Sequence, residues 1–250
     1  MGIISIVEAS IISSMATLVV TILYEAFKKP VPVTRLDHFI RVHFKKGKIK
    51  GNDLTYRTTF IIEEASEREV LDYLIGGGQK GKYYDLMNVG LSGVKIENLI
   101  ADEYKIRGEI NIRKLNGRLG FKIYKEDSDY DSGNNEENEV NLTFSVTIHD
   151  WGYKQVKDIL FDISKYQEHV SNYLSKRYQY QTNETVVEFE TNSEPVVLSY
   201  INKNDSFNDQ IKIKLNGNVY AYFYKQHCEI TGVKTSSDFE EIINAISWYV

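Results

Sequence analysis

The chain has 250 residues, of which 42% are hydrophobic and 26% are charged. That length is enough for one large domain or two small ones with a hydrophobic core. A net charge of −5 at pH 7 excludes a surface that attracts polyanions everywhere, although one basic face could still do so. Cys228 is the single cysteine, so the chain forms neither an intramolecular disulfide nor a zinc site built from cysteines.

The first segment, residues 1–29, is apolar for about 25 positions, whereas a membrane-spanning helix needs roughly 20. We therefore expect a single-pass transmembrane anchor that contacts the membrane through residues 3–27. Lys28 and Lys29 follow the apolar run, and no basic residue precedes it. The positive-inside rule then places the remaining domain in the cytoplasm. The alternative is a soluble protein in which this helix is buried.

Residues 30–53 are expected to form a linker and one extra strand, at 38–44. A first structural unit follows at 54–178. It begins with a strand at 54–64 and a helix at 66–75, which Ser66 and Glu69 would cap. An insertion at 76–103 follows, and a short helix is expected within it at 83–90.

The tetrapeptide Lys-Leu-Asn-Gly occurs at 114–117 and again at 214–217. Asn-Gly between alternating runs favours a two-residue hairpin turn, because both residues accept positive φ. In the first hairpin this register pairs Ile112 with Phe121 and Ile110 with Ile123. The opposite face then carries Asn111, Arg113, Arg118, Lys122 and Tyr124.

A second insertion, the acidic run at 126–138, is expected to be a solvated loop between strands. The strand predicted at 139–148 precedes a helix of about 24 residues. Its apolar residues fall on one stripe: Val156, Ile159, Leu160, Ile163, Tyr166, Val170 and Tyr173.

A second structural unit is expected at 179–250. Its hairpin would pair Ile213 with Tyr220 and Ile211 with Tyr222. The opposite face would carry Lys212, Lys214, Val219, Ala221 and Phe223. A strand at 228–232 and a helix at 236–247, capped by Ser237 and Glu240, complete the unit.

The two units repeat one order of elements, which predicts an α+β protein with two degenerate β-α-β-β-β-α repeats. These repeats would form an antiparallel sheet with helices on one side, of the saddle or helix-grip type. Aligning the two Lys-Leu-Asn-Gly tetrads requires a one-residue bulge at Lys114, since otherwise the faces invert.

The segment 219–246, VYAYFYKQHCEITGVKTSSDFEEIINAI, resembles the end of a TATA-binding protein repeat. The family's Thr-Gly-Ala-Lys-Ser turn before a long helix is matched by Thr231 to Thr235. Phe223 stands where the family places a phenylalanine that wedges DNA. The resemblance implies a saddle of two repeats whose concave sheet face binds DNA. Glu229 departs from that pattern by placing a carboxylate on the same face.

No catalytic, metal or cofactor motif is identified. The run Gly76 to Lys82 has the spacing of a phosphate-binding loop, but Tyr83 stands where Ser or Thr must bind magnesium. The five histidines form no metal-ligand pattern. Cys228 alternates with Ile230, which favours a buried structural thiol.

The open sheet face is the best candidate for function. It would present Arg113, Arg118, Lys122, Tyr124, Lys212, Lys214, Val219, Ala221, Phe223 and Thr231. We expect a membrane-anchored, non-enzymatic interaction or assembly protein that binds a protein partner through this face. Two alternatives are nucleic-acid binding through the same residues and a face covered by another layer. No small-molecule substrate is inferred.

Overall fold

The structure is a computed structural model that describes residues 50–76, 81–125, 139–191, 211–215, 217–224, 226–234 and 238–246. Several predictions lie outside these residues. They are the anchor at 1–29, the linker and extra strand as far as residue 49, the acidic insertion at 126–138 and the cap at Ser237.

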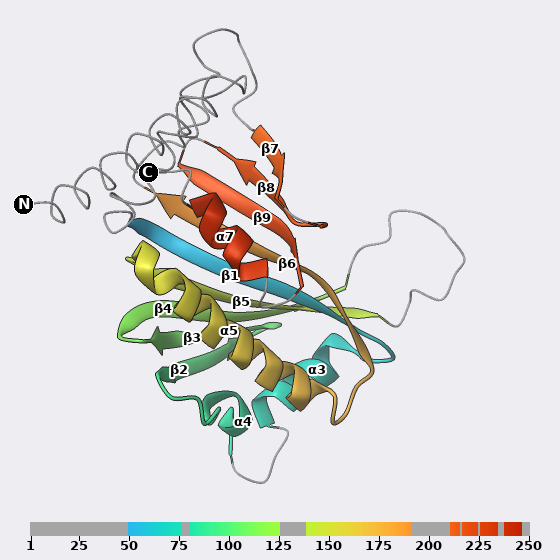
Figure 1. Ribbon diagram of the computed structural model, residues 1–250. Helices are drawn as coiled ribbons and strands as arrows, with labels where there is room; N and C mark the ends of the chain where they lie inside the picture. Colours follow the sequence, from blue (N-terminus) through green and yellow to red (C-terminus); the bar gives the residue numbers. More distant parts are fainter. Residues whose placement is uncertain are drawn as a thin grey trace, which may run out of the picture.

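The described residues form an α+β fold around one nine-stranded sheet, in which every strand pair is antiparallel (Figure 1). The order across the sheet is β2-β3-β4-β5-β1-β6-β9-β8-β7. The strands are β1 (Gly51–Ile62), β2 (Val94–Asp102), β3 (Lys105–Ile112), β4 (Leu115–Tyr124), β5 (Val140–His149), β6 (Tyr180–Thr191), β7 (Ile211–Lys214), β8 (Tyr220–Phe223) and β9 (His227–Val233).

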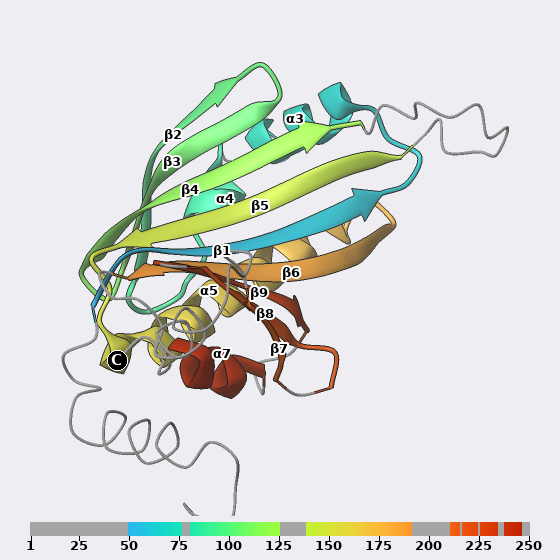
Figure 2. The same cartoon turned by 90° about the horizontal axis from the view of Figure 1, so that it is seen from above.

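The described helices are α3 (Glu67–Gly76), α4 (Tyr84–Met87), α5 (Tyr153–Leu174) and α7 (Phe239–Ile246). The predicted cap of α3 is confirmed, since the Ser66 backbone N–H donates to Glu69 Oε2 (2.9 Å) and the Glu69 N–H donates to Ser66 Oγ (3.3 Å). The hydrogen bond from the Ser66 backbone lowers the pKa of Glu69 below its ordinary value. In Figure 2, α5 and α7 lie on the same side of the sheet.

The hydrophobic core lies between the sheet and its helices. Along β1, Leu54, Tyr56, Thr58, Phe60 and Ile62 are buried, so alternate residues face the core. The predicted apolar stripe of α5 is confirmed, because all seven of its residues are buried. The Phe144 ring contacts the rings of Tyr56, Phe121 and Tyr166, which joins three strands to α5.

The first insertion contains a sheet strand that the sequence analysis did not identify. Residues 76–103 include α4, within the expected short helix, and also β2, which lies at one edge of the sheet. The β2–β3 register shifts between Glu97 and Ile100, and Asn98 has φ of +56°. This irregularity interrupts the alternation of apolar and polar residues by which a strand is recognised. Two hydrogen bonds hold α4 against α5, from Tyr166 Oη to the Leu86 carbonyl (3.1 Å) and between His169 Nε2 and the Asp85 carbonyl (2.7 Å).

The predicted register of the first hairpin is wrong. Ile112 pairs with Leu115, not with Phe121, and the turn residues are Arg113 (φ +51°) and Lys114 (φ +72°). Gly117 therefore lies within β4, where a Cβ would approach the Thr147 carbonyl oxygen of β5 to 2.3 Å. Close strand contact, and not a turn, requires this glycine.

Side-chain bonds explain why the turn forms three residues earlier than predicted. Arg113 Nε donates to Asp162 Oδ2 (2.7 Å) and Arg113 Nη1 donates to Asp158 Oδ2 (3.1 Å), so the turn is tied to α5. The Lys114 N–H donates to Asn111 Oδ1 (3.2 Å), which stabilises the turn locally.

The predicted register of the second hairpin is also wrong. Lys214 pairs with Tyr220 and Ile213 pairs with Ala221. The connection is five residues long, 215–219, and the Leu215 N–H donates to the Val219 carbonyl (3.0 Å). Such a connection displaces β8 by one residue from the expected register, which moves all its side chains to the other face.

The position of the first turn is testable by two substitutions. We expect Lys114→Val to lower the free energy of unfolding by roughly 1–3 kcal/mol, because a β-branched residue is strained at positive φ. Asn116→Thr should change it by less than about 1 kcal/mol, since Asn116 is a strand residue that loses only its side-chain bond to Asn111. Urea unfolding measures both values. A larger loss for Asn116→Thr would place the turn at Asn-Gly after all.

Candidate functional site

The candidate site is the face of the sheet opposite the core, which we call the open face. One residue from each strand forms a continuous row across it, as the pairing of successive strands shows. In sheet order the row contains Glu97, Glu109, Arg118, Thr147, Thr55, Glu188, Glu229, Tyr222 and Lys212. None of these side chains belongs to the buried core.

The middle of the open face is a strip of hydroxyl side chains on β1 and β5. Thr55 Oγ1 and Thr147 Oγ1 are 2.9 Å apart, and Thr59 Oγ1 and Thr143 Oγ1 are 3.0 Å apart. These hydroxyls are hydrogen-bonded to each other. A partner that covered the strip would therefore leave fewer buried polar groups without a hydrogen bond than it would over unpaired hydroxyls.

Cations gather on β3 and β4, in what we call the basic zone: Lys105, Arg107, Arg118 and Lys122. None of the four forms an ion pair with another described residue. Lys105 and Lys122 pair directly across the two strands. Lys122 Nζ also lies 4.8 Å from the ring centroid of Tyr124. The basic zone therefore contains four cations without an ion pair among the described residues, although Asp102 and Glu109 lie opposite Lys105 and Arg118 across the strands.

Carboxylates gather on β6 and β9, in what we call the acidic zone: Glu188, Glu190 and Glu229. Glu188 and Glu229 pair directly across the strands. Arg57 of β1 forms an ion pair with Glu188. The acidic zone lies on the far side of the hydroxyl strip from the basic zone.

A third group of charges occupies the edge hairpin of β7 and β8. Lys212 Nζ lies 4.5 Å from the ring centroid of Tyr220 and 5.0 Å from that of Tyr222. Lys214 Nζ lies 5.9 Å from the Tyr220 centroid. The side-chain hydrogen bond with Tyr222 raises the pKa of Lys212 above its ordinary value, so this lysine is charged at neutral pH.

Six of the predicted binding residues lie on the open face: Arg118, Lys122, Tyr124, Lys212, Lys214 and Thr231. Four others do not. Arg113 lies in the β3–β4 turn, where its guanidinium is paired with Asp158 and Asp162. Val219 and Phe223 are 4% and 0% exposed and face the core, as does Ala221. Their expected exposure is wrong, because β8 has the opposite phase to the one predicted.

The burial of Phe223 affects the resemblance to the TATA-binding family. A side chain within the core is not available to wedge between bases. Glu229 and Thr231, by contrast, lie on the open face as expected. The aromatic residues of β8 on the open face are instead Tyr220 and Tyr222.

One pair on the open face, His149 and Asp53, is not apparent from the sequence. His149 Nδ1 lies 2.6 Å from Asp53 Oδ1, and the two residues pair directly across β5 and β1. They are 96 positions apart in the sequence, so only the sheet register brings them together. Within the described residues, no group of three or more His, Cys, Asp or Glu side chains is arranged to hold a metal ion. Cys228 is buried, as predicted.

No protein-family model matches this chain, and no curated protein is similar enough to count as a relative. Among the described helices, none is both long and apolar enough to cross a membrane. The role of the open face is therefore argued from its geometry and charge.

The two faces of β8 predict different effects of truncation. We expect Phe223→Ala to lower the free energy of unfolding by about 3–5 kcal/mol, because it removes a fully buried ring. Tyr222 precedes Phe223 and lies on the open face, so Tyr222→Ala should lower the free energy of unfolding by less than about 1.5 kcal/mol. Thermal or urea unfolding of both variants tests this. Equal losses would mean that β8 does not separate a core face from an open face.

Proposed function

We propose that this chain is a non-enzymatic interaction or assembly protein that binds a protein partner through the open face. The observation that carries the proposal is the placement of like charges directly opposite each other, Lys105 with Lys122 and Glu188 with Glu229. Of these four residues, only Glu188 forms an ion pair with another described residue, Arg57. Like charges at such positions destabilise a sheet. A partner of complementary charge would relieve this repulsion, and complementary charge also gives an interface its specificity.

Two features favour a protein over a nucleic acid. The acidic zone lies between the basic zone and the cationic edge hairpin, so a phosphate backbone that crossed the sheet would meet Glu188 and Glu229. The rings of Tyr220 and Tyr222 are approached by Lys212, which reduces their availability for stacking on bases. A protein surface can instead alternate its charges to match all three zones.

Nucleic-acid binding is the second candidate function. The observation that favours it is the cluster of Lys212, Lys214, Tyr220 and Tyr222, since cations beside aromatic rings suit single-stranded nucleic acids. Salt-sensitive binding to DNA or RNA that Lys212→Glu and Lys214→Glu weaken would support it over a protein partner.

We also propose that the fold consists of two degenerate repeats, at 54–178 and 179–250, related to the saddle type. The strand order supports this. Each proposed repeat begins with a strand at the centre of the sheet (β1 or β6), and the last strand before its final helix (β5 or β9) lies beside it. The remaining strands then follow outward, as β4, β3 and β2 on one side and β8 and β7 on the other. Since β1 and β6 are antiparallel neighbours, two such repeats would be related by a pseudo-two-fold axis between these strands.

The membrane anchor at 1–29 and the cytoplasmic placement of the sheet domain stay part of the proposal. They rest on the apolar run at residues 3–27 and on the basic residues that follow it. A full chain that is extracted completely without detergent would contradict the anchor and favour the alternative, a soluble protein with a buried amino-terminal helix.

The decisive substitution is Glu229→Lys, because it should change stability and binding in opposite directions. Replacing one of two facing carboxylates by a lysine should raise the free energy of unfolding by about 0.2–1 kcal/mol, measured by urea unfolding. The same change should reduce capture of the partner by the tagged full chain at least tenfold, because it reverses the charge that the partner meets.

The matched control is Lys154→Glu, an exposed change of charge on α5 that should leave capture within twofold of wild type. Equal loss with the control, or full capture with Glu229→Lys, would contradict binding through the open face. Loss of the captured species on nuclease treatment would move the assignment to the second candidate function.

A further inference from the structure

One position on the open face, within the basic zone, has no side chain. Gly120 lies on β4 between Arg118 and Lys122, which face the same side of the sheet. Its neighbour on β3 is Arg107, and its neighbour on β5 is Ser145. A Cβ at Gly120 would approach Ser145 Oγ to 2.9 Å, so even an alanine would require a shift there.

Three cations surround this glycine, and together with Gly120 and Ser145 we call them the Gly120 site. Arg118 and Lys122 are each two residues away along the strand, or roughly 7 Å, and Arg107 is one strand spacing away, or roughly 5 Å. Long, exposed Arg and Lys side chains can therefore converge on one group placed above Gly120. Ser145 Oγ, which donates to the Gly120 carbonyl at 3.4 Å, adds a hydroxyl beside the same spot.

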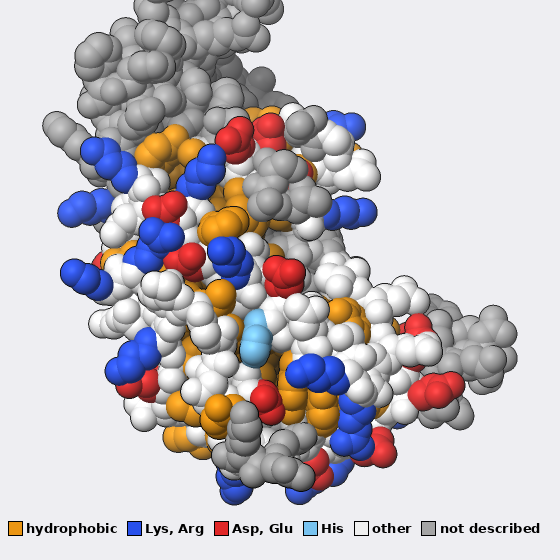
Figure 3. Space-filling view, turned by 60° about the horizontal axis from the view of Figure 1, so that its bottom comes forward, with side chains coloured by type: hydrophobic (Ala, Val, Ile, Leu, Met, Phe, Trp, Pro, Cys, Tyr) orange, Lys and Arg blue, Asp and Glu red, His pale blue; other side chains and the backbone are white. Residues whose placement is uncertain are grey.

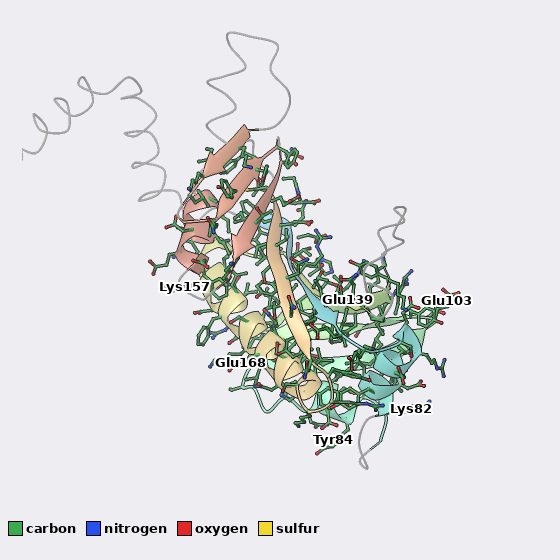
Figure 4. All side chains as sticks on the ribbon, turned by 90° about the vertical axis from the view of Figure 1, so that its right-hand side faces the viewer. Lys82, Tyr84, Glu103, Glu139, Lys157 and Glu168 are labelled. Atoms are coloured by element: carbon green, nitrogen blue, oxygen red, sulfur yellow. The ribbon has the colours of Figure 1, made fainter. Side chains whose placement is uncertain are left out.

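Acidic residues border the Gly120 site on several sides. Glu97 and Glu109 pair across β2 and β3, and Glu188 lies two strands beyond β5. Glu103 lies in the turn before β3, and Glu139 lies just before β5, beside the end of β4. Figure 4 shows both on the right, away from Lys157 and Glu168 of α5. The Ile123 N–H donates to the Tyr104 carbonyl (2.9 Å), which holds the β2–β3 turn beside the end of β4. The site therefore suits a short anionic segment better than a long polyanion.

The opposite side of the molecule lacks such zoning. In Figure 3, which brings the lower side of the molecule forward, blue and red side chains are interspersed and the orange apolar ones form several separate patches. On α5, Lys157 is paired with Glu240 Oε1 at 3.0 Å, whereas Lys154 and Lys165 form no ion pair with a described residue. The gathering of three cations around a position without a side chain thus distinguishes the Gly120 site.

We infer that the Gly120 site binds carboxylates from an acidic segment of the partner protein, with one carboxylate above Gly120 between Arg107, Arg118 and Lys122. This inference rests on the proposed function and specifies which part of the partner meets the basic zone. Guanidinium groups bind carboxylates through paired N–H donors, and such charge-assisted bonds are the stronger ones. The absence of a side chain at Gly120 lets the carboxylate approach the sheet closely enough to meet all three cations.

The test uses the full chain and two fluorescent probes of equal charge, an eight-residue glutamate peptide and a single-stranded eight-phosphate oligothymidylate. Fluorescence anisotropy at fixed ionic strength measures both dissociation constants. We expect the peptide to bind, with Arg118→Glu raising its dissociation constant at least tenfold. Gly120→Thr should raise it at least threefold, because a side chain there occupies the position of the carboxylate. Lys154→Glu is the matched control and should change it by less than twofold.

Thermal unfolding of each variant separates loss of the site from loss of the fold. If Gly120→Thr proves unstable, Gly120→Thr with Ser145→Ala removes the contact with Ser145 Oγ and repeats the measurement. Equal loss with the control, or peptide binding that Gly120→Thr leaves unchanged in a folded protein, would overturn the inference. The inference would also be overturned if the oligonucleotide bound more tightly than the peptide and both Arg118→Glu and Gly120→Thr weakened its binding. That result would assign the site to phosphates. If Glu229→Lys still abolishes partner capture while Gly120→Thr has no effect, the proposed function stands and only this inference fails.

Discussion

The packing of α5 against the middle of the sheet determines which face remains open. Tyr166 of α5 packs against Phe144 of β5, and Phe144 contacts Tyr56 of β1 and Phe121 of β4. Since side chains alternate along a strand, burying these three strand residues turns their neighbours to the other side. Thr55, Arg57, Ser145 and Lys122 therefore face away from the core because of one helix. The composition of the open face depends on this contact.

The alternation of residue types was enough to predict the core faces of most strands, but not the strand register. Phe121 and Ile123 are buried and Arg118 and Lys122 are open, as expected, although the hairpin turn lies elsewhere. The Asn-Gly signal is local, whereas the actual turn is stabilised by a bond from Arg113 to Asp162, 49 positions along the chain. In β8 the same local signal predicted Phe223 on the open face and Tyr222 in the core, whereas the structure has them the other way round. A displacement of one residue in a connection is enough for this, because the side-chain period of a strand is two.

From the sequence, the candidate site could be predicted only for residues that share one strand. Arg118 and Lys122 share β4, and Lys212 and Lys214 share β7, so their alternation places each pair on one face. The zones, however, arise from strands that are distant in sequence. Glu188 meets Glu229 through the β6–β9 pairing, and His149 meets Asp53 through the β5–β1 pairing. The resemblance to a saddle fold suggested such a sheet without fixing these registers, so the pairs became visible only in three dimensions.

The like-charge pairs indicate that the open face is not arranged for stability alone. Exchanging Lys122 or Glu229 for a residue of opposite charge would replace a repulsive cross-strand pair by an attractive one. Elsewhere the fold has favourable pairs, as between Arg113 and two aspartates, and Arg57 partly offsets the repulsion at Glu188. Each repulsive pair costs only a few tenths of a kcal/mol or so, which a large core readily offsets. Binding sites commonly retain such unfavourable local arrangements. Under the proposed function, the same charges that weaken the isolated sheet would become favourable contacts once a partner of opposite charge covers them.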